Sequence, residues 1–177
     1  MLYIITPCSR PQNLQVISKT IPIDSRWIIC SDQNLDINLT IPHTHLKCKQ
    51  TGKFGIKARN YVLDNFTFQN SDHILFHDDD NIIHSKLYSV ISQYFDYDFS
   101  IMCWGQLNKD NSIRLEPSSN PKRYKIDTAS YLIKWKYNKF VRHQEDLYIH
   151  DGIYAEDCSK NGPIFKINDY LCYYNFL

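Results

Sequence analysis

A length of 177 residues suits one domain built around a single sheet, and a hydrophobic content of 43% supplies enough apolar side chains for its core. The formal net charge is only +1, which argues against a nucleic-acid coat protein or a polybasic membrane binder. No leader peptide is recognisable, and no apolar stretch approaches the roughly 20 residues that cross a bilayer. We therefore expect a soluble, cytoplasmic protein with no nucleic-acid partner and no integral membrane segment.

The first hundred residues alternate between apolar strands and amphipathic helices. Strands are predicted at 2–6, 26–32, 39–48 and 73–77. Helices are predicted at 9–21, 53–66 and 82–95. Because Pro42 cannot donate a hydrogen bond to a neighbouring strand, it marks 39–48 as an edge strand.

The second half of the chain is richer in strands. The predicted elements are a strand at 99–104, two strands within 111–135, a helix at 151–162, and closing strands at 163–167 and 170–176. This order predicts an α/β fold with a mostly parallel sheet that becomes mixed and is flanked by helices. No internal repeat or linker interrupts it, so we expect one domain over residues 1–177.

The motifs of several common sites are missing. None of the six cysteines has C-x-x-C or zinc-finger spacing, and we expect buried free thiols. The Walker A, G-x-G-x-x-G and G-x-S-x-G patterns are absent, and five glycines are too few for a glycine-rich phosphate loop. Among the histidines, His77 is expected to be a satisfied strand residue and His150 a possible neighbour of an acceptor site.

Three adjacent aspartates, Asp78, Asp79 and Asp80, directly follow the strand predicted at 73–77. At roughly 5 Å and an effective dielectric near 20, each neighbouring pair repels by on the order of 3 kcal/mol, so something must neutralise them. If the chain stays extended, Asp78 and Asp80 share a face and Asp79 turns away. Two hard oxygen ligands on one face suit Mg²⁺ or Mn²⁺, carried with a phosphorylated substrate.

The order of these segments resembles the GT-A class of nucleotide-sugar glycosyltransferases, notably the small family 2-like enzymes. The opening strand with TPCSRP (6–11), the strand IICSD (28–32), GIKARN (55–60), LFHDDDN (75–81) and IDTASYLI (126–133) match that class in order and position. The closing segment from His150 to Asn175 is also similar. The resemblance implies a GT-A-like, Rossmann-like domain with a nucleotide-sugar-binding half at 1–100 and an acceptor half at 101–177.

The resemblance also implies roles for particular residues. The donor, with a UDP-sugar favoured, would be contacted by Thr6, Pro7, Arg10, Asp32, Lys57, Arg59, Asn60, Asp78 and Asp79. The metal, Mn²⁺ or Mg²⁺, would be held by Asp80 and Asp78, and it would stabilise charge on the departing diphosphate. The expected activity is metal-dependent transfer of a sugar, with inversion, to a hydroxyl of a glycan or another small acceptor.

Inverting transfer needs a carboxylate that takes the proton of the acceptor hydroxyl. Asp151 is the first candidate, since we expect it to cap the helix at 151–162 and so to have a fixed orientation. Glu156 and Asp157 are the alternatives, because many enzymes of this class place the base in such an acidic pair. Two other functions stay open: a metal-dependent phosphohydrolase or nuclease, and a non-catalytic nucleotide-sugar-binding module.

Overall fold

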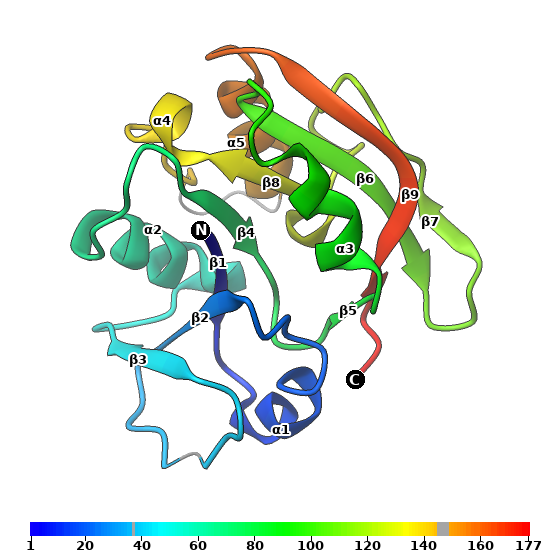
Figure 1. Ribbon diagram of the computed structural model, residues 1–177. Coiled ribbons are helices and arrows are strands. Elements are labelled where there is room, and N and C mark those ends of the chain that lie inside the picture. The colour runs from blue at the N-terminus through cyan, green and yellow to red at the C-terminus, as the bar shows by residue number, and fades with distance from the viewer. Residues whose placement is uncertain (37, 145–148) are drawn as a thin grey trace.

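A computed structural model describes residues 1–36, 38–144 and 149–177 (Figure 1). The strands are β1 Leu2–Pro7, β2 Ser25–Ser31, β3 His43–Lys47, β4 His73–Phe76, β5 Ile82–Ile83, β6 Ile101–Asn108, β7 Ile113–Leu115, β8 Tyr131–Lys134 and β9 Ile164–Tyr174. The α-helices are α1 Leu14–Ile17, α2 Ile56–Asn65, α3 Leu87–Ile91, α4 Trp135–Asn138 and α5 His150–Ser159. Short 3-10 turns lie at Pro11–Asn13, Lys53–Gly55, Ser92–Tyr94 and Thr128–Ser130.

One sheet connects all of these strands, in the order β3-β2-β1-β4-β8-β6-β9-β5, with β7 paired to β6. β1 runs parallel to both β2 and β4, and β3 runs parallel to β2. β3 lies at the edge of the sheet, as Pro42 predicted. Beyond β4 the sheet becomes mixed, since β8 is antiparallel to β4 and β6 while β9 is parallel to β6. The predicted α/β architecture, parallel first and mixed later, is confirmed.

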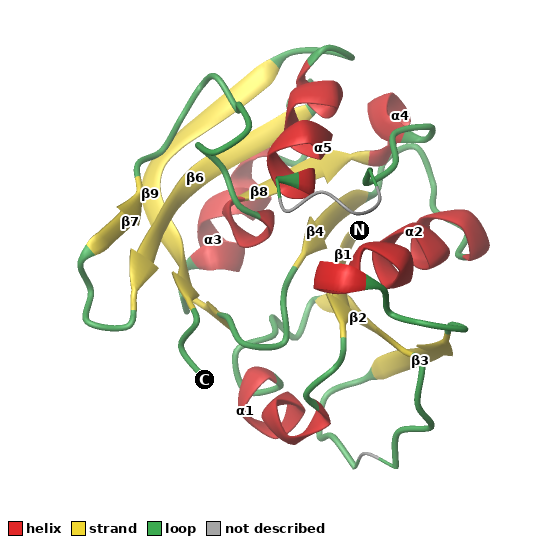
Figure 2. Cartoon of the chain, turned by 180° about the vertical axis from the view of Figure 1, so that it is seen from behind, coloured by secondary structure: helices red, strands yellow, loops and turns green. Residues whose placement is uncertain are grey.

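Helices cover both faces of the sheet, as the unbroken apolar strands require. Because side chains alternate along a strand, Leu2 and Ile4 of β1 join the core under α1 and α3, whereas Tyr3 and Ile5 join the core under α2 and α5. Figure 2 shows α2 and α5 together on one side. All six cysteines are buried and free, as expected, and none of the described helices is long and apolar enough to cross a membrane.

Several predicted boundaries are wrong. The helix predicted at 82–95 begins only at Leu87, because Ile82 and Ile83 form β5 and pair with Tyr173 and Cys172 of β9. The helix predicted at 9–21 is reduced to a 3-10 turn and the single turn of α1. The two closing strands are one continuous strand, β9, which bridges β6 and β5.

Candidate functional site

A cavity of about 450 Å³ opens where β1 and β4 end. Ligands of open α/β sheets bind at this end of the parallel strands. The charged side chains that line it are Arg10, Arg59, Asp78, Asp79, Asp80, Arg114, Asp127 and Asp151, with His150 beside them. Loops after β1 and β4, the start of α2 and the start of α5 supply most of this wall, so residues far apart in sequence meet here.

The three adjacent aspartates do not continue β4, which ends at Phe76. Alternation of side chains along a strand therefore does not apply to them. All three residues line the cavity, but the Asp79 carboxylate is buried and directed to the loop after β1. Each has its own partners. Two arginines, Arg10 and Arg59, contact these carboxylates and reduce their mutual repulsion. The sequence had suggested a divalent cation for that role.

Asp79 is the anchor of this turn. Its carboxylate is buried and accepts hydrogen bonds from the backbone N–H groups of Ser9 and Arg10, both at 2.7 Å. It also accepts one from Nε of Arg10 at 2.8 Å. Asn13 donates to the carbonyl oxygen of Asp79 at 2.7 Å. These contacts fasten the end of β4 to the loop that follows β1.

Asp80 shares Arg10, whose Nη2 lies 2.8 Å from its carboxylate. Burial and the neighbouring charge of Asp78 nevertheless hold the pKa of Asp80 above its ordinary value. Burial opposes ionisation of Asp78 as well, but Arg59 and the Thr128 hydroxyl outweigh it and hold the pKa of Asp78 below its ordinary value. The two predicted metal ligands therefore differ in how well their negative charge is compensated. Arg59 compensates the charge of Asp78, whereas Arg10 compensates that of Asp80 only in part.

Arg59 is a fully buried cation on the first turns of α2. Its guanidinium contacts the carboxylate of Asp78, donates to the carbonyl oxygen of Phe54 at 2.6 Å, and has Nη1 3.9 Å from Oδ1 of Asp151. Burial lowers the pKa of Arg59, but Asp78 and Asp151 outweigh it and raise the pKa overall. Arg59 therefore stays charged and holds two acidic walls of the cavity together.

Two charged cavity residues were not singled out from the sequence, Asp127 and Arg114. Asp127 caps the 3-10 turn Thr128–Ser130 by accepting from the Thr128 N–H at 2.7 Å, and Arg114 Nη1 lies 2.7 Å from its other oxygen. Burial and then the charges of Asp151 and Asp78 raise the pKa of Asp127. The sequence offered one signal for Asp127, its place as a capping residue shortly before a strand. Nothing in the sequence showed that Asp127 faces Asp78 and Asp151.

One hydroxyl lies among three of these carboxylates. Thr128 Oγ1 is 3.0 Å from Asp78, 3.1 Å from Asp127 and 3.3 Å from Asp151. Since a hydroxyl carries one proton, it satisfies one of them at a time. Among the described residues, five aspartates and three arginines line the cavity, so two negative charges stay unmatched. The hard oxygen donors and this charge surplus fit Mg²⁺ or Mn²⁺.

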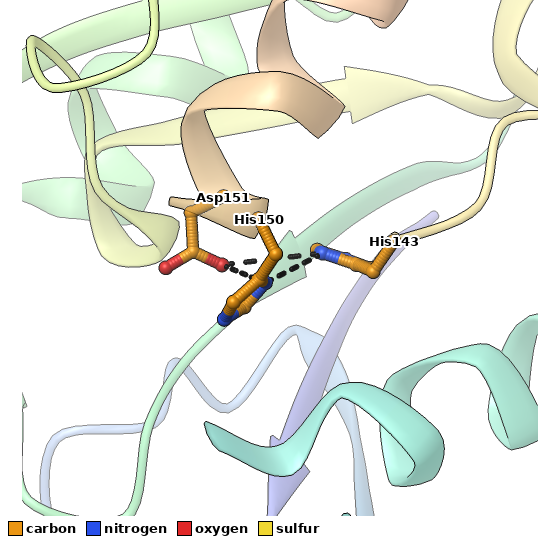
Figure 3. A group of neighbouring side chains, drawn as sticks. All are labelled: His143, His150 and Asp151. Atoms are coloured by element: carbon orange, nitrogen blue, oxygen red, sulfur yellow. Dashed lines mark hydrogen bonds and ion pairs between the residues drawn. The ribbon is translucent and has the colours of Figure 1, made fainter. Parts of the chain in front are cut away.

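Asp151 lies beside two histidines (Figure 3). His150 Nδ1 is 2.8 Å from Asp151 Oδ1, and His143 Nδ1 is 3.2 Å from His150 Nδ1. The prediction that Asp151 caps this helix was wrong, because Ile149 occupies the cap position and Asp151 lies inside the first turn of α5. His150 lines the cavity. His77 is fully buried directly after β4, and burial lowers its pKa to about 4.

Some of the remaining predicted site residues line the cavity, and others lie outside it. Pro7 joins Arg10, Arg59 and the three aspartates in the cavity wall. The predicted residues that lie outside this wall are Thr6, Asp32, Lys57, Asn60, Glu156 and Asp157. Thr6 is buried and accepts from Trp27, and Asn60 exchanges two hydrogen bonds with the backbone of His143.

No protein-family model and no curated protein sequence matches the chain. Solved structures do. TarS 1–349 from S. aureus has a TM-score of 0.68 at 15% identity, covering 97% of this chain and 59% of that one. 4-Diphosphocytidyl-2C-methyl-D-erythritol synthase has 0.58 at 10%, covering 95% and 88%. A Bacillus anthracis protein named as a glucose-1-phosphate thymidylyltransferase has 0.55 at 15%, covering 93% and 85%.

These likenesses define the class of fold. The chain has the GT-A-like type of α/β fold that the order of its motifs predicted. At sequence identities of 15% or less, these similarities establish the fold but not the reaction. The chain also spans only 59% of the TarS structure, so activity, substrates and partners are matters for proposal.

Proposed function

We propose that this chain transfers a sugar from a nucleotide-sugar donor, with a UDP-sugar favoured, to a hydroxyl of a glycan or another small acceptor. The observation that carries the proposal is the cavity where β1 and β4 end, into which five aspartates and three arginines converge. Its volume of about 450 Å³ suits a ligand of this size.

The donor end of the site is built on the aspartates after β4. Asp80 and Asp78 would hold a Mg²⁺ or Mn²⁺ ion, and when bound this ion would neutralise charge on the departing diphosphate. The raised pKa of Asp80, caused by burial and by Asp78, reports the like-charge repulsion that a cation would relieve. Arg10, whose side chain is 44% exposed at the cavity, can turn toward a phosphate.

The acceptor end is proposed to lie at Asp151. In the transfer, the acceptor oxygen bonds to the anomeric carbon, the bond from that carbon to the diphosphate oxygen breaks, and the hydroxyl proton passes to Asp151. Attack opposite to the leaving group inverts the configuration. Glu156 and Asp157 are less suitable, because they pair with Arg123 and Lys160 outside the cavity wall.

A second candidate activity is nucleotidyl transfer. Its support is specific: proteins named as a thymidylyltransferase and as an inositol-1-phosphate CTP transferase share this fold over 85% and 87% of their own chains. In that reaction a sugar-phosphate oxygen attacks the α-phosphorus of a nucleoside triphosphate and pyrophosphate leaves. The two activities therefore break different bonds.

The leaving group decides between these activities. The protein is incubated with Mn²⁺ and UDP-, GDP-, CMP- or dTDP-sugars, or with nucleoside triphosphates and sugar phosphates, and products are identified by mass spectrometry. Sugar transfer yields a nucleoside diphosphate or, from CMP-sugars, CMP, and in the absence of acceptor slow donor hydrolysis yields the same nucleotide. Pyrophosphate release would instead establish nucleotidyl transfer.

Two variants test the residue roles. Asp80→Asn and Asp151→Asn should each lower turnover by at least a hundredfold, while Asp157→Asn, on the same helix as Asp151, should retain it. Donor binding without turnover, indifferent to Asp151→Asn, would point to a binding module. Metal-dependent cleavage of DNA or of simple phosphate esters would point to the hydrolase alternative.

A further inference from the structure

Three potential metal-ligating atoms converge at the start of α5. His143 approaches from the segment before α5, and His150 and Asp151 project from its first turn, so that all three side chains point toward one another (Figure 3). Nδ1 of His150 is 3.2 Å from Nδ1 of His143 and 2.8 Å from Oδ1 of Asp151, and Nδ1 of His143 is 3.9 Å from the same oxygen.

These separations match the edges of a coordination tetrahedron. Metal–nitrogen and metal–oxygen bonds of about 2.0–2.1 Å place neighbouring ligand atoms of a tetrahedral ion about 3.3–3.4 Å apart. The three observed separations, 2.8, 3.2 and 3.9 Å, bracket that value. One ion could therefore contact all three atoms after side-chain shifts of a few tenths of an ångström.

The ligand atoms are also chemically available. Both histidine side chains are buried, and their Nδ1 atoms face each other at 3.2 Å. Oδ1 of Asp151 is buried and accepts no hydrogen bond, although an imidazole nitrogen lies 2.8 Å away. A buried carboxylate oxygen that accepts no hydrogen bond can be satisfied by a bound cation.

We propose that His143, His150 and Asp151 bind a transition-metal ion such as Zn²⁺ or Co²⁺ through two Nδ1 atoms and one carboxylate oxygen. Two imidazoles and one carboxylate favour such borderline ions over Mg²⁺, which prefers all-oxygen sites. His150 and Asp151 line the cavity, so water or a ligand from the cavity can complete the tetrahedron. Its ligands differ from Asp78 and Asp80, the proposed ligands of Mg²⁺ or Mn²⁺. Because Asp151 is also the proposed base, Oδ1 would bind the ion and Oδ2 would be left to accept the proton of the acceptor.

The surroundings support the site from two sides. The His143 backbone is fixed to α2, because its N–H donates to Asn60 Oδ1 at 2.9 Å and its carbonyl accepts from Asn60 Nδ2 at 2.8 Å. Arg59 lies 3.9 Å from the Asp151 oxygen, but it also contacts Asp78, which balances its charge. An ion here would link α2 to the first turn of α5 and so stiffen one wall of the cavity.

Cobalt spectroscopy tests the proposal without an activity assay. The metal-free protein is titrated with Co²⁺, whose tetrahedral complexes absorb visible light far more strongly than the octahedral aquo ion. We expect saturation at one Co²⁺ per chain, loss of the absorption when Zn²⁺ is added, and no loss with excess Mg²⁺. Absorption that never rises above that of aqueous Co²⁺ would overturn the proposal.

Variants locate the ion. His143→Gln and His150→Gln should each weaken Co²⁺ binding at least tenfold, while His45→Gln on the edge strand β3 and Asp80→Asn should leave the spectrum unchanged. Near-ultraviolet circular dichroism checks that each variant is folded, and if buried His143→Gln does not fold, His150→Gln at the cavity wall decides. An unchanged spectrum in His150→Gln, or a spectrum lost in Asp80→Asn alone, would refute the assignment.

Discussion

At the scale of single residues, three identical neighbours have three different environments. Asp79 is buried and accepts backbone and side-chain hydrogen bonds from the loop after β1, whereas Asp78 faces the buried Arg59 and Asp80 faces the half-exposed Arg10. The sequence identified the triplet and set Asp79 apart from its neighbours, but it could not show their partners, which come from segments about 20 and 70 residues away. Asp79 is therefore the structural member and its neighbours are the ones left for chemistry.

This division predicts the effect of removing Asp79. Asp79→Ala leaves the N–H groups of Ser9 and Arg10 without their acceptor, and we expect the free energy of unfolding to fall by about 2–4 kcal/mol. Urea denaturation measures it. Asp110→Ala, at an exposed turn where the carboxylate bonds only to Ser112, is the control and should leave the midpoint nearly unchanged. Equal midpoints for the two variants would contradict the anchoring role.

The pKa of Asp127 predicts a dependence of stability on pH. Burial, Asp151 and Asp78 raise it, so the folded state binds the proton more tightly than the unfolded state. The stabilising contribution is then present below the unfolded pKa of about 3.9 and is lost as pH rises through the folded pKa. The Asp127→Asn variant keeps an oxygen that can cap the turn but has no carboxylate to ionise. The melting temperature of the variant minus that of the natural protein should therefore rise as pH increases from about 3.9 through the folded pKa of Asp127.

A control with the opposite sign accompanies this measurement. Hydrogen bonds from Tyr137 and then Lys136 lower the pKa of Asp98, an exposed residue far from the cavity. Its contribution is present above the unfolded pKa and is lost as pH falls through the folded pKa. Asp98→Asn should therefore become less stable relative to the natural protein as pH rises. Parallel trends for the Asp98 and Asp127 variants would contradict the assignment.

At the scale of elements, the sequence predicted strands better than helices. The strands β1, β2 and β4 are unbroken apolar runs, which is the pattern of parallel strands covered on both faces. Ile82 and Ile83 misled the helix prediction because two apolar residues fit either period, and only pairing with β9 decides. The same limit applied to the site: Asp127 and Arg114 were missed because long-range packing, not local pattern, brings them to the cavity.

The junction between α2 and β1 predicts an unusually sensitive glycine. Gly55 has φ +72°, and an added Cβ would lie 2.5 Å from Cβ of Pro7. Gly52 has a similar φ of +74°, but its added Cβ would meet only the flexible side chain of Lys57. Both alanine variants bear about 1–2 kcal/mol of backbone strain, so the difference between them isolates the collision with Pro7.

We expect Gly55→Ala to be less stable than Gly52→Ala by about 1–3 kcal/mol, measured by urea denaturation. The collision would also displace the start of α2, and with it Arg59, from the aspartates after β4. If Gly55→Ala also weakens donor binding and Gly52→Ala does not, the position of α2 affects the site. Equal stabilities would show that the loop relaxes around the added methyl group.

At the scale of the whole molecule, charge is nearly balanced but unevenly placed. The chain carries 20 Lys and Arg against 19 Asp and Glu, yet the described cavity wall holds five aspartates and three arginines. A diphosphate entering this surplus of negative charge is repelled unless a cation enters with it. We therefore propose that donor binding is coupled to a divalent ion, whichever of the two proposed transfers the protein performs.

This coupling predicts a thermal shift that needs both ligands. At a donor concentration of 100 Kd the folded state gains about 2.7 kcal/mol, which for a chain of this size raises the melting temperature by about 5–10 °C. We expect that rise with Mg²⁺ and a UDP-sugar together and little change with the donor in EDTA. Asp80→Asn should abolish it and Asp110→Asn should preserve it. The same rise in EDTA would show that the arginines alone bind the diphosphate, and Asp80 would lose its proposed role.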